Sequence, residues 1–251
     1  MWMIKRFLSP AGREKYSDIR KYVTERVPRL YNQIIGRDLR YFPQAWVRKE
    51  HIGSRYDGKQ VCIDNITPES VVFSFGIGRD ISFDLTMIER FDVDVYAFDP
   101  TPISKEWLKK QILPEKFHFF DFGLADYDGF VELYPFWPDD PTAHDFTILN
   151  PSKVNERTIS CPVHKMATIL NMLEHDKIDI LKMDIEGSEY AVIDDILASE
   201  IEVTQLLVEF HHRFENVGLV ATERAIKALN EHGYRIFSIG PDGQEYSFIR
   251  V

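Results

Sequence analysis

The 251-residue sequence predicts an α/β fold with a mostly parallel sheet, and three observations lead to this prediction. From residue 71 onward, short apolar runs alternate with stretches whose apolar residues recur at helical spacing. Two glycines, Gly76 and Gly78, follow the first buried run, as at a turn that approaches a ligand. The chain closes in a hairpin at 234–250, which makes its last strand antiparallel to its neighbour.

The N-terminal part differs in pattern from the rest of the chain. Apolar residues recur at helical spacing over 13–35, and Pro28 should break or kink this stretch into two short amphipathic helices. A turn-rich link at 52–58 precedes a short strand at 61–63. We therefore expect residues 1–50 to form a helical extension or lid, and residues 51–251 to form the main domain.

The main domain is expected to alternate strands and helices. The apolar runs predict strands at 71–75, 93–98, 117–120, 131–134, 178–183 and 206–210, then two strands in the closing hairpin. The helical spacing predicts helices at 82–90, 104–112, 166–174, 188–198 and 222–232. Residues 135–156 contain four prolines and receive no regular structure; loops of this length often cover a functional site.

The composition excludes several classes of protein. Apolar residues make up 44% of the chain, so disorder over most of its length is excluded. No apolar run approaches the roughly 20 residues of a membrane-spanning helix, and charges interrupt the first eight residues where a secretory signal would be apolar. Two cysteines are too few for a disulfide framework. We expect a cytoplasmic protein with no transmembrane segment.

The charge is divided unevenly along the chain. The net charge is −10, but residues 1–60 carry +8 and residues 61–251 carry −18. An acidic body repels phosphates, so no nucleic-acid partner is expected. The basic segment either lies against the acidic body or faces an acidic substrate or an anionic membrane surface.

The turn after the first strand and the acid after the second strand suit a nucleoside. The dinucleotide fingerprint needs a third small residue where this chain has Ile81, so a nicotinamide or flavin dinucleotide is disfavoured. Asp99 lies 21 residues beyond Gly78, the spacing at which an acid accepts hydrogen bonds from ribose hydroxyls. The alternative is that Asp99 only caps the following helix. The turn at 121–125 suits an adenine or is an ordinary turn around a buried Phe122.

Charged residues also follow the later strands. Asp184 and Glu186 stand two residues apart at a strand end, where like charges are costly unless they have a use. Ser188 as helix N-cap, with Glu189 in the first turn, gives the third acid a structural role. Glu209 and His211 end the next strand, and His211 is a candidate general base. These acids and His211 could instead hold a divalent metal, or His211 could be structural.

These motifs resemble the FkbM type of S-adenosylmethionine-dependent methyltransferases. The resemblance is carried by the turn at 75–78, Asp99, the run at 182–190 and the strand end at 207–211. The segments at 52–58 and 72–78 are similar to the branch that contains methyltransferase-like protein twenty-four. The resemblance covers about residues 50–251 and implies a three-layer, Rossmann-like class I methyltransferase fold. In that fold a mostly parallel seven-strand sheet has an antiparallel C-terminal strand.

The resemblance also implies a cofactor, S-adenosyl-L-methionine, and roles for individual residues. Gly76 and Gly78 would approach its methionine part, Asp99 would bind its ribose, and Asp184 would lie near the transferred methyl. The expected cofactor-binding residues are Phe75, Gly76, Ile77, Gly78, Asp80, Asp99, Pro100, Asp121, Phe122, Gly123, Leu124 and Asp184. Many such enzymes have an acid where this chain has Ser74, so Asp80 or Asp57 is expected to contact the cofactor's amino group.

The reaction expected from this resemblance is methylation of a hydroxyl on a sugar, a small metabolite or a glycan. A hydroxyl needs a base, which is either His211 or the Asp184–Glu186 pair, with Glu209 orienting. No metal is expected; the alternative ligands are Asp184, Glu209 and His211. Two other functions remain open: an inactive nucleoside-binding scaffold, and a nicotinamide-dependent oxidoreductase.

Overall fold

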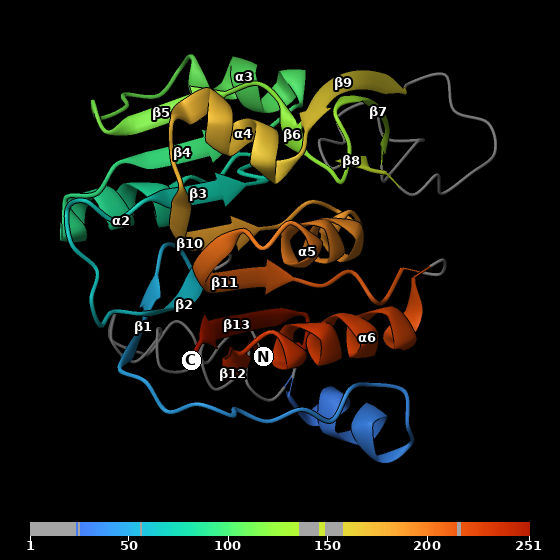
Figure 1. Cartoon of the computed structure of the whole chain (residues 1–251). Coiled ribbons are helices and arrows are strands. Elements are labelled where there is room, and N and C mark those ends of the chain that lie inside the picture. The colour runs from blue at the N-terminus through green and yellow to red at the C-terminus, as the bar shows by residue number, and fades with distance from the viewer. Residues whose placement is uncertain (1–23, 25, 56, 136–145, 149–157, 215–216) are drawn as a thin grey trace, which may run out of the picture.

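The structure is a computed structural model that describes residues 24, 26–55, 57–135, 146–148, 158–214 and 217–251 (Figure 1). A seven-stranded sheet forms its centre, in the order β12-β13-β11-β10-β3-β4-β5. Its strands are β3 (Val72–Phe75), β4 (Val95–Phe98), β5 (Phe117–Phe120), β10 (Lys177–Met183), β11 (Glu202–Glu209), β12 (Tyr234–Ile239) and β13 (Glu245–Arg250). Neighbouring strands are parallel except where β13 pairs with β11 and β12. The predicted α/β fold with a large mixed sheet is confirmed.

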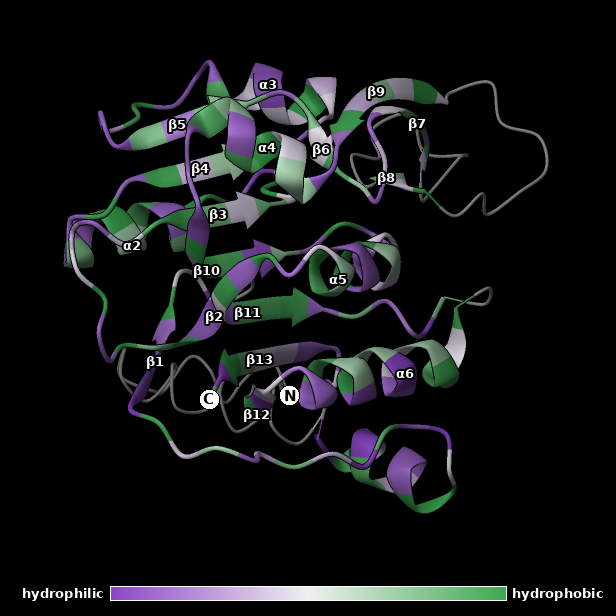
Figure 2. Ribbon diagram, in the orientation of Figure 1, coloured by the Kyte–Doolittle hydropathy of each residue, from purple (hydrophilic) through white to green (hydrophobic). Residues whose placement is uncertain are grey.

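Helices cover both faces of this sheet. They are α2 (Ser82–Phe91), α3 (Pro102–Leu108), α4 (Met166–Leu173), α5 (Glu189–Ala198) and α6 (Gly218–Glu231). Side chains alternate between the faces: Phe73 belongs to the core on the face that α4, α5 and α6 cover, whereas Val72 belongs to the core on the α2 face. Figure 2 shows β11 as mostly hydrophobic and α6 as mixed, as expected for a buried strand and a half-exposed helix.

Strand order reverses between β3 and β10. From β3 the chain moves outward through α2 to β4 and through α3 to β5. It later returns through α4 to β10, on the other side of β3, and continues through α5 to β11. The loops that follow β3 and β10 therefore leave in opposite directions and open a crevice at the carboxyl ends of these strands.

A second, four-stranded sheet has the order β6-β9-β7-β8 and lies beside the end of the large sheet (Figure 1). Its strands are β6 (Gly123–Leu124), β7 (Gly129–Pro135), β8 (Phe146–Thr147) and β9 (Ile159–His164). The strand predicted at 131–134 belongs here, and β9 was not predicted. Of the segment expected to lack regular structure, 136–145 and 149–156 lie outside the described residues.

The described part of the N-terminal extension lies at the β12 edge of the large sheet. Residues 26–34 are helical on both sides of Pro28, so the break expected there does not occur. Gln44 accepts a hydrogen bond from the backbone of Ile236 and donates its own backbone N–H to the same residue. Strand β1 (Lys49–Ile52) then pairs antiparallel with β2 (Lys59–Cys62) over the α2 face. Among the described residues no helix has the length and apolarity needed to cross a bilayer.

A buried lysine holds this hairpin to the sheet. Lys59 has a side chain only 3% exposed, and its Nζ lies 2.9 Å from Glu209 and 3.0 Å from Glu245. Burial lowers the pKa of Lys59, but the two carboxylates outweigh it and raise the pKa above its ordinary value. The lysine therefore stays charged and neutralises carboxylates from β11 and β13.

Replacing Lys59 with methionine should leave these two carboxylates without their counter-ion in a partly buried place. We expect Lys59→Met to lower the free energy of unfolding by about 3 kcal/mol, measured by urea denaturation. The control is Lys109→Met, which removes an exposed ion pair with Glu106 and should cost less than about 0.5 kcal/mol. Equal effects of the two substitutions would show that the Lys59 cluster does not stabilise the fold.

Candidate functional site

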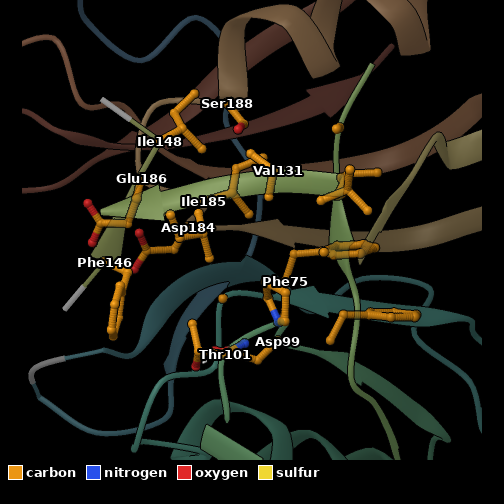
Figure 3. A pocket seen from close by; sticks show the side chains of 18 of the residues that line it. Phe75, Asp99, Thr101, Val131, Phe146, Ile148, Asp184, Ile185, Glu186 and Ser188 are labelled. Atoms are coloured by element: carbon orange, nitrogen blue, oxygen red, sulfur yellow. Dashed lines mark hydrogen bonds between the residues drawn. The ribbon is translucent and has the colours of Figure 1, made fainter. Parts of the chain in front are cut away.

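A cavity of about 430 Å³ lies in the crevice where the strand order reverses (Figure 3). This volume lies in the range of small-molecule sites. Four segments form its walls: the turn after β3, the end of β4, the loop after β10 and the four-stranded sheet. The expected site residues that line it are Phe75, Gly76, Ile77, Gly78, Asp80, Asp99, Pro100, Gly123, Leu124, Asp184 and Glu186.

Gly76 forms the floor where β3 and β10 end. Its φ is +75°, and a Cβ added there would lie 1.7 Å from the carbonyl oxygen of Asp184. The backbone N–H of Asp184 donates to Phe75 at 3.1 Å, which draws the two strand ends together. Only glycine fits this contact. Gly78 also has a positive φ of +49°, but no atom lies within 4 Å of a Cβ added there.

Asp99 is fixed at the end of β4 and joins it to the glycine turn. Its Oδ2 accepts a hydrogen bond from the backbone N–H of Gly78 at 2.9 Å. Its Oδ1 accepts from the backbone and hydroxyl of Thr101, at 2.9 and 2.6 Å. A carboxylate oxygen has two lone pairs, so Oδ2 retains capacity for a ligand hydroxyl. Thr101, and not Asp99, caps α3.

The turn after β5 divides into residues that line the cavity and residues that do not. Gly123 and Leu124 line it beside Pro100 and form an apolar wall. Phe122 is buried under that wall, with its ring 5.4 Å from the ring of Phe98. Asp121 lies outside the lining, where its exposed carboxylate pairs with Lys105. We expected the whole turn at 121–124 to lie beside the adenine. The structure places only its second half, Gly123 and Leu124, in the cavity.

Two carboxylates lie on the β3 side, where Ser74 itself is fully buried. Asp57 lines the cavity, and its Oδ2 lies 3.3 Å from Nζ of Lys182. Lys182 is fully buried and also donates to the carbonyl of Gly76 at 3.2 Å. Asp80 lines the cavity and accepts hydrogen bonds from Ser54 and Ser82, which lower its pKa against the effect of burial. Both acids that were expected to replace an acid at position 74 thus reach the cavity.

The loop after β10 brings two further carboxylates to the opposite wall. Asp184 and Glu186 lie side by side there, next to Phe146 (Figure 3). Burial raises the pKa of both carboxyls above their ordinary values. Glu186 has a left-handed φ of +53°, and its carbonyl accepts a hydrogen bond from Thr147 of β8 at 2.9 Å.

The buried side chain of Glu189 holds the loop after β10 in place by hydrogen bonds to its backbone. Its side chain is fully buried, and its carboxylate accepts hydrogen bonds from the backbone N–H groups of Ile185 and Gly187 at 3.1 Å. Ser188 stands at the N-cap position of α5 but makes no side-chain capping bond. The capping role expected of Ser188 therefore belongs to Glu189. The structural role expected of Glu189 in the first turn is therefore present, and its hydrogen bonds to the preceding loop are what the sequence pattern did not show.

His211 joins Glu189 to the two cavity carboxylates. Its Nδ1 lies 2.8 Å from Glu189, and its Nε2 lies 3.7 Å from Asp184 Oδ1 and 3.4 Å from Glu186 Oε2. Burial lowers the pKa of His211, but the hydrogen bond to Glu189 and the surrounding carboxylates outweigh it and raise the pKa to about 10. In the absence of another cation the ring carries a proton at neutral pH, and a general base needs the unprotonated form.

The side chain of Glu209 faces Lys59 and not the cavity. It pairs with Lys59 at 2.9 Å and does not line the cavity. Among the described residues, three side chains are close enough together to hold a metal ion. They are Asp184, Glu186 and His211, whose ligand atoms lie within 4.8 Å of one another. The residues that could hold a metal thus include Glu186 where the sequence alternative had Glu209.

Several lining residues could not be foreseen from the strand ends. Phe146 and Ile148 belong to the segment that received no regular structure, and Val131 and Leu133 come from β7. Arg79, which is exposed, adds a positive charge to the lining of the cavity. The described part of the N-terminal extension does not line the cavity; the first lining residue along the described chain is Asp57.

The fold and the cavity define an α/β protein with a cavity of ligand size at the switch point of its sheet. A family model described as the methyltransferase FkbM domain matches residues 78–236, which is more than half of the chain. This protein belongs to the FkbM methyltransferase family.

Relatives agree with this membership at low identity. The chain is 23% identical over 191 residues to the probable methyltransferase-like protein 24 of Rattus norvegicus, covering 59% of this chain and 52% of that protein. It is 24% identical over 177 residues to the Homo sapiens protein of the same name, covering 66% and 41%. The chain spans about half the length of the curated relatives it matches.

A solved structure is also similar. The crystal structure of methyltransferase FkbM from Methylobacillus flagellatus KT matches with a TM-score of 0.45 and 13% identity, covering 74% of this chain and 45% of that one.

The two glycines of the turn give a matched test of the close backbone contact. We expect Gly76→Ala to lower the free energy of unfolding by more than about 3 kcal/mol, because the new Cβ collides with the Asp184 carbonyl. Gly78→Ala should cost only about 1 kcal/mol, the strain of a left-handed alanine. Urea denaturation measures both, and equal losses would contradict the contact.

The charge state of His211 can be observed directly by nitrogen-15 NMR titration of the imidazoles, in protein treated with a chelator. We expect an apparent pKa near 10, which Glu189→Gln should lower. The folded protein holds this proton more tightly than the unfolded chain, whose histidine titrates near 6.5. The stability it contributes is therefore complete below pH 6.5 and is lost as the pH rises toward 10.

The neighbouring His212 serves as the control in the same spectra. Burial and the charge of Arg213 lower the pKa of His212 to about 4, so its ring should remain neutral across this range. A His211 resonance that titrates near its ordinary value would show that the carboxylates do not hold the proton.

Proposed function

We propose that this protein is an S-adenosylmethionine-dependent methyltransferase that acts on a hydroxyl group. The observation that carries the proposal is the cavity at the switch point, with Gly76 on its floor and Asp99 at the end of β4. Family membership supports the methyltransferase part. The strand order, helices on both faces and the reversed β13 support the class I methyltransferase fold.

The residues present fit a nucleoside with a charged amino-acid tail. Asp99 Oδ2 has capacity for a ribose hydroxyl, and the apolar wall of Pro100 and Leu124 suits a purine face. Asp57 and Asp80 supply carboxylates for an amino group at the other end of the cavity. Bound S-adenosylmethionine would supply a methyl group already activated on a sulfonium centre.

The chain's own task is then to place and deprotonate the acceptor. Asp184 and Glu186 line the cavity on the side of the β10 loop. We propose that this pair of carboxylates takes up the proton of the acceptor hydroxyl. His211 lies behind them and, held by Glu189, orients them. Glu209 is occupied by Lys59 and supports the fold.

The wall formed by β7 and β8 is proposed as the acceptor side of the cavity. Its residues Val131, Phe146 and Ile148 are apolar and face the acidic loop, so a largely apolar acceptor with one reacting hydroxyl would fit. Residues 1–50 are proposed as an N-terminal extension of this domain, of which the structure describes residues 24 and 26–50.

The cofactor is tested by calorimetric titration with S-adenosylmethionine and S-adenosylhomocysteine. We expect both to bind, and we expect Asp99→Asn to weaken binding by about tenfold or more, because the amide loses the charge and one acceptor oxygen. The substitution keeps the size of the side chain, so the fold should persist.

The control for this titration is Asp94→Asn at the opposite end of β4. Asp94 pairs with His118, lies outside the cavity and should have no effect on cofactor affinity. Absence of binding to either compound would exclude the proposed function. Formation of S-adenosylhomocysteine on addition of a hydroxylated acceptor would extend it to catalysis.

A further inference from the structure

We propose that Asp184, Glu186 and His211 bind a divalent metal cation at the edge of the cavity. The role given to this cation rests on the proposed function, because the cation would hold the hydroxyl of the methyl acceptor. Its binding, however, is a property of three side chains and can be measured without cofactor or acceptor.

The distances suit a shared ion better than direct hydrogen bonds. Nε2 of His211 lies 3.4 Å from Glu186 Oε2 and 3.7 Å from Asp184 Oδ1, beyond the usual length of a hydrogen bond. Two atoms bonded to one tetrahedral ion at about 2.1 Å lie about 3.4 Å apart. The two distances from Nε2 therefore match those between ligands of one metal ion, and the three ligand atoms all lie within 4.8 Å of one another.

The orientation of His211 points to the same conclusion. Its side chain is only 6% exposed, and its Nδ1 is held at 2.8 Å by the fully buried Glu189. A histidine that binds metal through one nitrogen commonly donates its other N–H to a carboxylate, which fixes the ring. Glu189 gives His211 this support, and Nε2 is aimed at the two cavity carboxylates.

Acidic side chains outnumber basic ones in the cluster. Asp184, Glu186 and Glu189 surround one imidazole, so three carboxyl groups of the cluster share a single basic group. The buried lysines nearby have other partners: Lys59 binds Glu209 and Glu245, and Lys182 binds Asp57. A dication held between these side chains would be attracted by the carboxylates that line the cavity.

Three protein ligands would leave part of the coordination sphere open. Asp184 and Glu186 line the cavity, so the open positions face it. Metal sites that act on substrates keep such a position free, and a hydroxyl bound there has a lowered pKa. Imidazole with carboxylates favours Mn²⁺ or Zn²⁺ over Ca²⁺. The expected acceptor is therefore a hydroxyl compound that can coordinate a metal.

The experiment titrates chelator-treated protein with Mn²⁺, followed by electron paramagnetic resonance, and with Zn²⁺, followed by calorimetry. We expect one site per chain for either ion. Glu186→Gln should weaken binding by at least about tenfold, because it removes a charged ligand from a partly exposed position without disturbing the core. The matched control is Glu115→Gln, at an exposed residue that precedes β5 and does not line the cavity; this variant should bind each ion like the unaltered protein.

Two results would overturn the proposal: no site for either ion, or equal affinity in Glu186→Gln and in the unaltered protein. Asp184→Asn, with its fold checked by circular dichroism, repeats the test at a second ligand. Titration with S-adenosylmethionine in the presence of chelator separates the two proposals. Cofactor binding without a metal site would reject only the metal, and a metal site without cofactor binding would reject only the proposed function.

Discussion

The backbone contact between Gly76 and the carbonyl of Asp184 is the constraint on which the rest of the site depends. It joins the ends of β3 and β10, the two strands between which the sheet reverses its order. Because these strand ends touch, the loops beyond them must separate, and the cavity lies between those loops. Buried Lys182 of β10 donates a hydrogen bond from its ammonium group to the carbonyl of the same glycine, which helps to hold the turn in place.

The sequence predicted the large sheet well because its strands are buried on both faces and read as apolar runs. It also placed Gly76, Asp99 and Asp184 correctly at the mouth, since strand ends on one sheet edge must meet. It did not predict β9, whose Pro162 argues against a strand. That proline is accommodated in a small sheet of four strands, a tertiary context that local pattern does not show.

The roles of the charged residues were harder to predict than their positions. Glu209 and His211 alternate along one strand end, yet one pairs with Lys59 and the other with Glu189. Both partners lie far away in the sequence or on another element, and no spacing rule connects them. Proximity of several acids to one histidine also reverses the protonation expected for an isolated ring. Long-range electrostatics, and not helix or strand propensity, limited the prediction.

The strands of the small sheet that forms one wall are hydrogen-bonded to one another, and the hydroxyl of Thr147 ties this sheet to the carbonyl of Glu186. Residues such as Val131 and Phe146 can therefore be exchanged without removing a bond from the strands that carry Asp99 and Gly76. Evolution can thus change the shape of this wall while the opposite wall stays constant. Related chains are expected to diverge first in the compounds they accept.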